Sequence, residues 1–205
     1  MRQELQHFLG FVNYAQRFIP NMAGVTAPLT DLLWKGIEYR WGEKERVSFS
    51  ALKTFPCSTP VLRIVDPHRP FEGITDTSNI AIGATLLQDF GEGLQPIAYE
   101  SRKLHPPEQN YPIHDKEMLA IMHAFNVWRC YLTDVGMTVR TDHRSLQYIR
   151  AQPLLNPRHI RWLDFMESNF HYTVTYKKGH QILQTPFLAH PPISTPSSLP
   201  KPPRY

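Results

Sequence analysis

Cysteine is scarce in this chain of 205 residues, which contains only Cys57 and Cys130. Neither cysteine has a second cysteine or a histidine at the spacing that is typical of a zinc site. A disulfide framework is therefore not expected, and both residues are predicted to be reduced, buried thiols in a reducing compartment.

Long apolar runs are also missing. The first residues, "MRQELQHFLGFVNYAQRF", are interrupted by polar side chains and lack the apolar core of a signal peptide. No run approaches the roughly 20 apolar residues that a membrane helix needs. We therefore expect an intracellular protein with no membrane partner, whose compartment the sequence does not identify.

Neither sign of charge dominates: 22 basic and 18 acidic residues give a formal net charge of +4. Hydrophobic residues make up 41% and charged residues 20%, which is ordinary for a globular protein and excludes disorder of the whole chain. Mild basicity permits a nucleic-acid partner without requiring one. Residues 191–205, "PPISTPSSLPKPPRY", contain six prolines and are predicted to be a disordered tail.

The first part of the chain has the pattern of short helices. Apolar residues recur at helical spacing from Leu5 to Ile19, and Pro20 ends the run. A second helix is expected over residues 26–34, with Pro28 in its first turn, and a third over 43–55. By pattern alone this is a small helical subdomain without chemistry of its own.

The rest of the chain predicts an α/β fold. Three strands in an antiparallel meander are expected over residues 69–78, 81–90 and 94–103, because turn signals separate them. The elements expected after them are a helix over 112–132, a strand over 137–143, helices over 145–150 and 156–169, a strand over 171–178 and a possible last helix over 181–190. This order indicates a mixed sheet flanked by helices.

Three carboxylates occupy the ends of these elements. Asp76 lies near the end of the first predicted strand, Asp142 near the end of the strand after the long helix, and Glu117 in that helix's first turn, on the face towards the sheet. If the two strands are neighbours, the three acids converge. Such a cluster suits Mg²⁺ or Mn²⁺ and supports attack of water on a phosphodiester.

Each acid also has an ordinary structural explanation. An aspartate at a strand end is commonly a turn or capping residue, and a glutamate in a first helical turn commonly interacts with the helix dipole. Only the occurrence of all three in an order that brings them together favours a site.

Four segments carry a resemblance to a known family. They are "FLGFVNYAQRFIPNMAGVTAPLTDLLWKG", "TPVLRIVDPHRPFEGITDTSNIAIGATLLQ", "IAYESRKLHPPEQNYPIHDKEMLAIMHAF" and "RTDHRSLQYI" with "RWLDFMESNFHYTVTYKKG". Together they closely resemble the C-terminal part of reverse transcriptases from gypsy-type LTR retrotransposons, from about residue 3 to 190. The resemblance implies a thumb-like end over 1–58, a connection over 59–70 and a ribonuclease H-like domain over 71–190, with a five-stranded mixed sheet.

The same resemblance implies cleavage of the RNA strand of RNA–DNA hybrids with two Mg²⁺ ions. The family's catalytic acids fall on Asp76, Glu117 and Asp142, whereas Asp115 falls on an acidic position that is not catalytic. No polymerase palm is present, so a polymerase domain or subunit would be supplied elsewhere. The chain is thus expected to be a fragment, relic or co-opted piece of a retroelement polyprotein.

The family's fourth acid is missing. Its motif near the end of the domain corresponds to "GHQILQTPFLAH", in which Gly179 and Leu188 match but Pro186 stands at the catalytic aspartate. Proline offers no ligand atom, so the second metal ion is predicted to be poorly held. His180 is an alternative ligand at this place. The missing acid leaves two hypotheses open: an active hybrid-cleaving nuclease, or a catalytically inactive hybrid-binding or structural module.

A hybrid-binding surface is suggested by the basic later half of the chain. Gln88 and Ser101 are further candidates for contact with the hybrid, whereas Phe125 and Trp128 are expected in the core. The basic residues are Arg144, Arg150, Arg158, Arg161, Lys177, Lys178 and His180, with Tyr148, Trp162 and Tyr172 near them in sequence. The alternative explanation is a solvated charged face.

Overall fold

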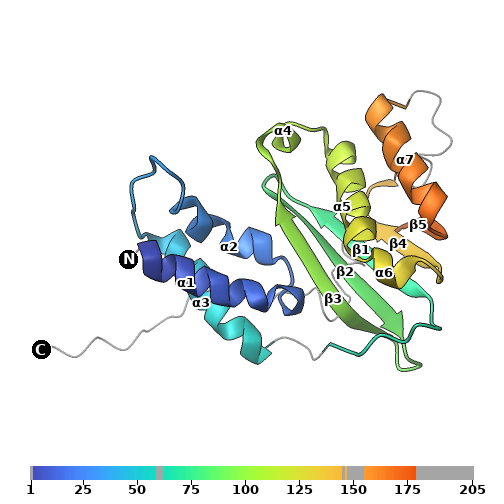
Figure 1. The fold of residues 1–205 in the computed structure, drawn as a ribbon, viewed down its shortest axis with the longest axis horizontal. Coiled ribbons are helices and arrows are strands. Elements are labelled where there is room, and N and C mark those ends of the chain that lie inside the picture. The colour runs from blue at the N-terminus through green and yellow to red at the C-terminus, as the bar shows by residue number, and fades with distance from the viewer. Residues whose placement is uncertain (1, 59–61, 145, 147–154, 179–205) are drawn as a thin grey trace, which may run out of the picture.

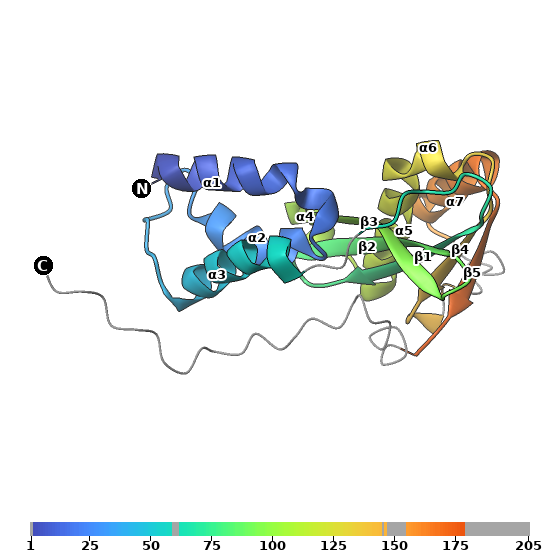
Figure 2. The same cartoon turned by 90° about the horizontal axis from the view of Figure 1, so that it is seen from below.

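The computed structural model describes residues 2–58, 62–144, 146 and 155–178. It places the N-terminal helices at one end of the molecule and a mixed sheet covered by further helices at the other (Figures 1 and 2). The predicted last helix, the Pro-rich tail, Pro186 and His180 lie outside the described residues, as does the expected helix over 145–150 except for Leu146.

The N-terminal helices follow the apolar periodicity of the sequence. They pack around buried Leu5, Val12, Leu29 and Leu52. Their bounds are Arg2–Tyr14 (α1), Gln16–Phe18 (the short 3₁₀ helix η1), Met22–Asp31 (α2) and Glu43–Ser58 (α3).

Helix α2 begins four residues before its predicted start at residue 26, so Pro28 lies inside the helix and not in its first turn. The backbone N–H of Ala23 has no partner within the helix, and it donates to Ser101 Oγ at 2.9 Å. A capping partner 78 residues away leaves no trace in the local sequence. This contact corrects the expectation for Ser101, which is buried against α2 and is not available to a hybrid.

The sheet has five strands in the order β3-β2-β1-β4-β5, which confirms the predicted mixed sheet. Strands β1–β2 and β2–β3 pair antiparallel as a meander, and β4 pairs parallel with both β1 and β5. The strand bounds are Phe71–Thr77 (β1), Ala81–Asp89 (β2), Leu94–Lys103 (β3), Met137–Thr141 (β4) and Tyr172–Tyr176 (β5). In the β2–β3 turn, Gly91 and Gly93 both have φ of +97°, a conformation that favours glycine.

The long helix predicted over residues 112–132 is divided at Trp128. Helix α5 (Ile113–Val127) crosses the sheet, and the short α6 (Arg129–Leu132) follows. Cys130, on α6, is exposed and not buried as predicted. Trp128 and Phe125 are buried in the main core, as expected. Helix α4 (Pro106–Gln109) precedes α5. Helix α7 (Pro157–Asn169) packs beside α5.

Polar contacts join the helical end to the sheet. Lys103 Nζ lies 2.8 Å from Asp31 Oδ1, and Gln16 Nε2 donates to Glu100 Oε1 at 3.3 Å. Strand β3 therefore forms the border between the two parts of the chain. None of the described helices is both long enough and apolar enough to cross a membrane.

Leu86→Ala is expected to lower the free energy of unfolding by about 2–5 kcal/mol, because Leu86 is fully buried between the sheet and its helices. Urea unfolding of the whole chain measures the change. The control is Ile160→Ala, at a position that is 54% exposed, where a change within about 0.5 kcal/mol is expected. Equal effects of the two substitutions would contradict this description of the core.

Candidate functional site

Asp76 and Asp142 are brought to the same end of the sheet by the parallel pairing of β1 with β4. In the observed register, Phe71 pairs with Met137 and Ile74 with Arg140. Continuing this register by two residues sets Asp76 beside Asp142, which is the first residue after β4. The neighbouring strands that the sequence analysis required are therefore present.

Glu117 lies on α5, which packs against β1. It is the fifth residue of the helix, which starts at Ile113, and so lies just past the first turn in which it was predicted. Its side chain is 4% exposed, and among the described residues its Oε2 atom has no hydrogen-bond partner. An ionised carboxylate in such a position is strongly unfavourable without a cation.

Electrostatic coupling links the three acids. Burial, which is the largest cause, and the charges of Asp142 and Asp76 together raise the pKa of Glu117 from 4.5 to about 8. Desolvation also raises the pKa of Asp76, although its backbone neighbour Thr77 donates to Oδ1 at 2.8 Å and Asp142 adds repulsion. The three side chains thus act on one another as one anionic group.

The spacing of these acids is wider than that of a tight single-ion site. In the part of the chain that the structure describes, only His114, Asp115 and His159 bring three ligand atoms within 4.8 Å of one another. A pair of ions about 3.5–4 Å apart requires ligands that are spread over a larger region. The all-oxygen donor set and the unpartnered Glu117 Oε2 fit Mg²⁺ or Mn²⁺. Metal binding by the three acids stays a prediction.

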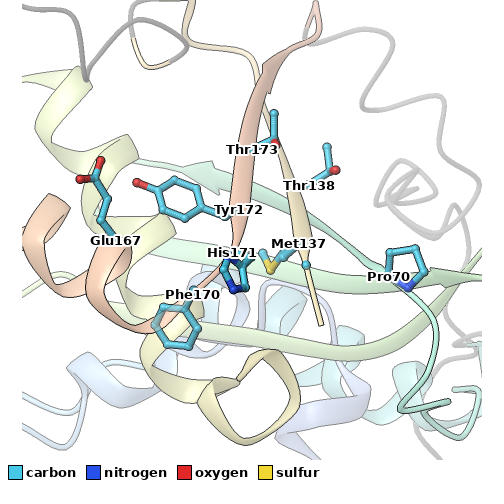
Figure 3. A pocket seen from close by; sticks show the side chains of 9 residues that line it. Pro70, Met137, Thr138, Glu167, Phe170, His171, Tyr172 and Thr173 are labelled. Carbon is cyan, nitrogen blue, oxygen red and sulfur yellow. The ribbon is translucent and has the colours of Figure 1, made fainter. Parts of the chain in front are cut away.

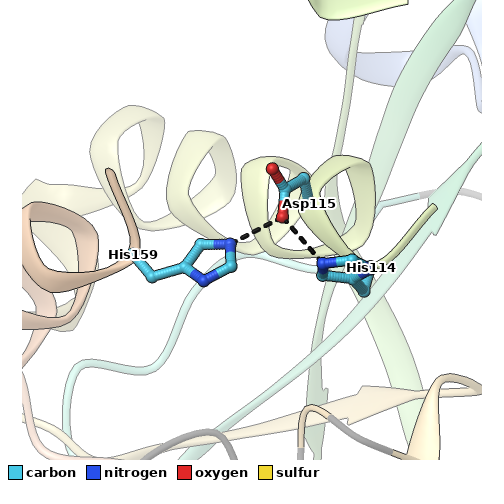
Figure 4. Close-up of side chains that lie close together, drawn as sticks. All are labelled: His114, Asp115 and His159. Atoms are coloured by element: carbon cyan, nitrogen blue, oxygen red, sulfur yellow. Dashed lines mark hydrogen bonds and ion pairs between the residues drawn. The ribbon is translucent and has the colours of Figure 1, made fainter. Parts of the chain in front are cut away.

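Asp115, only two residues before Glu117, has the opposite environment. It is buried, yet Arg158 Nη1 lies 3.0 Å from its Oδ2 atom, and His159 Nε2 and His114 Nε2 lie 2.6 and 3.1 Å from Oδ1 (Figure 4). Sequence analysis missed this cluster, because a pairing across 43 residues has no local pattern.

Several residues proposed for the hybrid surface have other roles. The Arg158 guanidinium contacts Asp115 and stacks on the ring of Tyr111 at 3.8 Å. Gln88 is fully buried, and its amide bonds the backbone of Asp66 and Arg69 at 2.8–2.9 Å. Arg158 and Gln88 therefore each connect segments of the fold that are distant in sequence. Arg144, Arg161 and Lys178 remain exposed.

A cavity of about 810 Å³ opens at the opposite end of the parallel strands (Figure 3). Pro70 stands just before β1, Met137 begins β4 and Tyr172 begins β5, so the cavity lies where these strands start. Asp76 and Asp142 lie where β1 and β4 end. The cavity is therefore not part of the carboxylate site.

Comparisons with known proteins agree with this architecture. Residues 66–170, about half of the chain, match the family described as "RNase H-like domain found in reverse transcriptase". The Tf2-3 and Tf2-4 transposon polyproteins of Schizosaccharomyces pombe are 36% identical over 183 residues, which are 87% of this chain and 14% of each polyprotein. The chain therefore spans a small part of these relatives.

Two solved structures share the fold. The foamy viral protease-reverse transcriptase in complex with dsDNA gives a TM-score of 0.71 at 23% identity, over 86% of this chain and 38% of that one. The same protein in complex with RNA/DNA hybrid gives a TM-score of 0.66 at 21% identity, over 99% of this chain and 28% of that one. The likeness extends to the N-terminal helices as well as the sheet.

Glu117→Gln is expected to change how stability depends on pH in metal-free buffer. The pKa of Glu117 is about 8 in the folded protein and 4.5 in the unfolded chain. Between pH 4.5 and pH 8 the folded state therefore binds more protons than the unfolded state, so the free energy of unfolding falls as the pH rises through this range. The Gln variant lacks this loss. Relative to wild type, it should gain on the order of a few kcal/mol in unfolding free energy from pH 5 to pH 8.5.

Chemical unfolding in EDTA across this pH range checks the result. Glu92→Gln is the matched control, because the Glu92 side chain is 77% exposed, and its profile should follow the wild type. Parallel profiles for wild type and Glu117→Gln would show that the pKa of Glu117 is not raised in the folded protein.

Proposed function

Because the chain belongs to the family of ribonuclease H-like domains found in reverse transcriptases, we propose that it cleaves the RNA strand of RNA–DNA hybrids with Mg²⁺. The observation that carries the proposal is the coupling of buried Glu117 to Asp76 and Asp142. Among the described residues the buried Oε2 atom of Glu117 has no hydrogen-bond partner, and a group of coupled carboxylates of this kind suits a divalent cation.

Each acid has a distinct task in the proposed site. Glu117 is fixed by α5 and buried, so its carboxylate approaches the ions from a rigid element. Asp76 and Asp142 face it from two paired strands and supply further hard oxygen ligands. Bound Mg²⁺ or Mn²⁺ would supply Lewis acidity at the scissile phosphate and neutralise the three carboxylates.

The wider assignment follows the sequence resemblance and is likewise a proposal. Residues 1–58 correspond to the thumb of a gypsy-type reverse transcriptase, 59–70 to a connection and 71–190 to the nuclease domain. The relatives are transposon polyproteins, and the polymerase palm would come from another part of such a polyprotein. The exposed Arg144, Arg161 and Lys178 would contact hybrid phosphates.

A second candidate function is a catalytically inactive module that binds hybrid or supports a polymerase. Pro186 favours it, since this residue replaces the fourth expected acid and has no ligand atom. With no fourth acid, the second ion that the family resemblance implies would then be poorly held. The two candidates differ in whether the present sequence cleaves.

Asp76→Asn is expected to lower cleavage of a labelled RNA–DNA hybrid in Mg²⁺ by at least about 100-fold, because it removes a ligand charge from the site. Asp134→Asn, at an exposed position away from the acids, makes the same chemical change and should retain full activity. Denaturing gels of the RNA strand provide the measurement. Wild type that is as inert as Asp76→Asn would exclude the nuclease and leave the binding module.

Pro186→Asp is expected to lower the Mg²⁺ concentration needed for half-maximal cleavage by about 10-fold or more, because it restores a carboxylate to the family's fourth position. Rates measured across a Mg²⁺ series compare the variant with wild type. Activity that occurs only in Pro186→Asp identifies an inactive relic. An unchanged Mg²⁺ requirement together with full wild-type activity would mean that another ligand, such as His180, completes the site.

A further inference from the structure

We propose that His114, Asp115 and His159 form a second metal site, for Zn²⁺ or a similar transition-metal ion, separate from the three carboxylates. The proposal does not depend on nuclease activity. It rests on the arrangement of two imidazoles and one carboxylate between α5 and α7 (Figure 4).

The ligand atoms already lie close together, with both imidazole nitrogens directed at Asp115 Oδ1. Asp115 Oδ1 lies 2.6 Å from His159 Nε2 and 3.1 Å from His114 Nε2, and the three atoms all lie within 4.8 Å of one another. Figure 4 shows the carboxylate between the two rings. An ion bound at about 2.0–2.2 Å from each atom needs only a small outward movement of the rings.

Arg158 prepares the carboxylate for such a role. Its guanidinium holds Asp115 Oδ2 at 3.0 Å, which leaves Oδ1 for the imidazoles. Ligating carboxylates are commonly oriented by a hydrogen bond of this kind. The charge of Arg158 opposes a cation, so the affinity must come from the two nitrogen ligands. This requirement favours an ion that prefers imidazole.

The donor set separates this site from the acids. Two imidazoles and one carboxylate suit Zn²⁺, Co²⁺ or Ni²⁺, whereas carboxylates alone suit Mg²⁺ and Mn²⁺. The His114 side chain is 46% exposed, so water can reach the ion and take a remaining position. Asp115 and His159 are 5% and 6% exposed and form the inner wall.

Binding of the ion requires only a change of tautomer in His114 and His159, with no oxidation or reduction. Without an ion, each Nε2 atom can donate its hydrogen to Asp115 Oδ1. With the ion bound, each neutral ring carries its hydrogen on Nδ1 and offers the Nε2 lone pair, while Asp115 remains a carboxylate.

The ion would link two helices at their first turns. His114 and Asp115 lie in the first turn of α5, which starts at Ile113, and His159 lies in the first turn of α7, which starts at Pro157. An ion that binds only the folded chain raises its stability by mass action. Because Asp115 stands two residues before Glu117, the link would also fix the turn that leads to Glu117.

Titration of the full chain with Co²⁺ and Zn²⁺ tests the proposal. We expect the intense visible absorption of four-coordinate Co²⁺, displaced by Zn²⁺, and a rise in Tm of roughly 5–10 °C at a Zn²⁺ concentration about 100 times Kd. His114→Ala and His159→Gln should each lose both signals. His68→Ala, at an exposed histidine outside the cluster, should retain them.

Asp76→Asn distinguishes the two sites, since it removes a carboxylate and leaves the cluster intact, and it should keep both signals. The proposal is overturned if His114→Ala binds like wild type, or if Asp76→Asn abolishes the Co²⁺ spectrum. If His159→Gln does not fold, His114→Ala still decides the question, because half-exposed His114 is not part of the core.

Discussion

The parallel pairing of β1 with β4 is the constraint on which the rest of the structure depends. The other strand paired with β1 is β2, its neighbour in the chain, whereas β2, β3 and α5 all lie between β1 and β4 in the sequence. This pairing sets α5 across the sheet and brings the ends of β1 and β4 together. Asp76 and Asp142 share one end of the sheet as a result, and Glu117 reaches it from the helix.

Helix α5 holds two buried acids in opposite conditions. Asp115 receives one guanidinium and two imidazoles, which satisfy its charge within the protein. Among the described residues Glu117 has no partner for Oε2, and two further carboxylates act on it. The fold therefore satisfies the charge of Asp115 within the protein, whereas without a cation it favours the protonated form of Glu117. A cation is therefore favoured at Glu117, which lacks a partner for Oε2 among the described residues. At Asp115 the neighbouring imidazoles favour an ion that binds nitrogen ligands.

Much of the fold could be predicted from the sequence because its signals are local. Strand patterns separated by glycine turns predicted the meander, and the apolar face that includes Phe125 predicted the long helix that packs on it. The start of α2 could not be predicted, because its cap is Ser101, 78 residues away. The candidate acids followed from strand and helix ends. The cluster around Asp115 and the burial of Gln88 did not, because both depend on partners that only the folded chain brings close.

The most direct test of the central claim is the number of protons released when Mg²⁺ binds at pH 7, measured by calorimetry in buffers of different ionisation enthalpy. With a pKa of about 8, Glu117 is mostly protonated at this pH, so Mg²⁺ binding at the three acids should expel about one proton per chain. Mg²⁺ binding without proton release, or no Mg²⁺ binding at all, would contradict the claim that Asp76, Glu117 and Asp142 form one cation site.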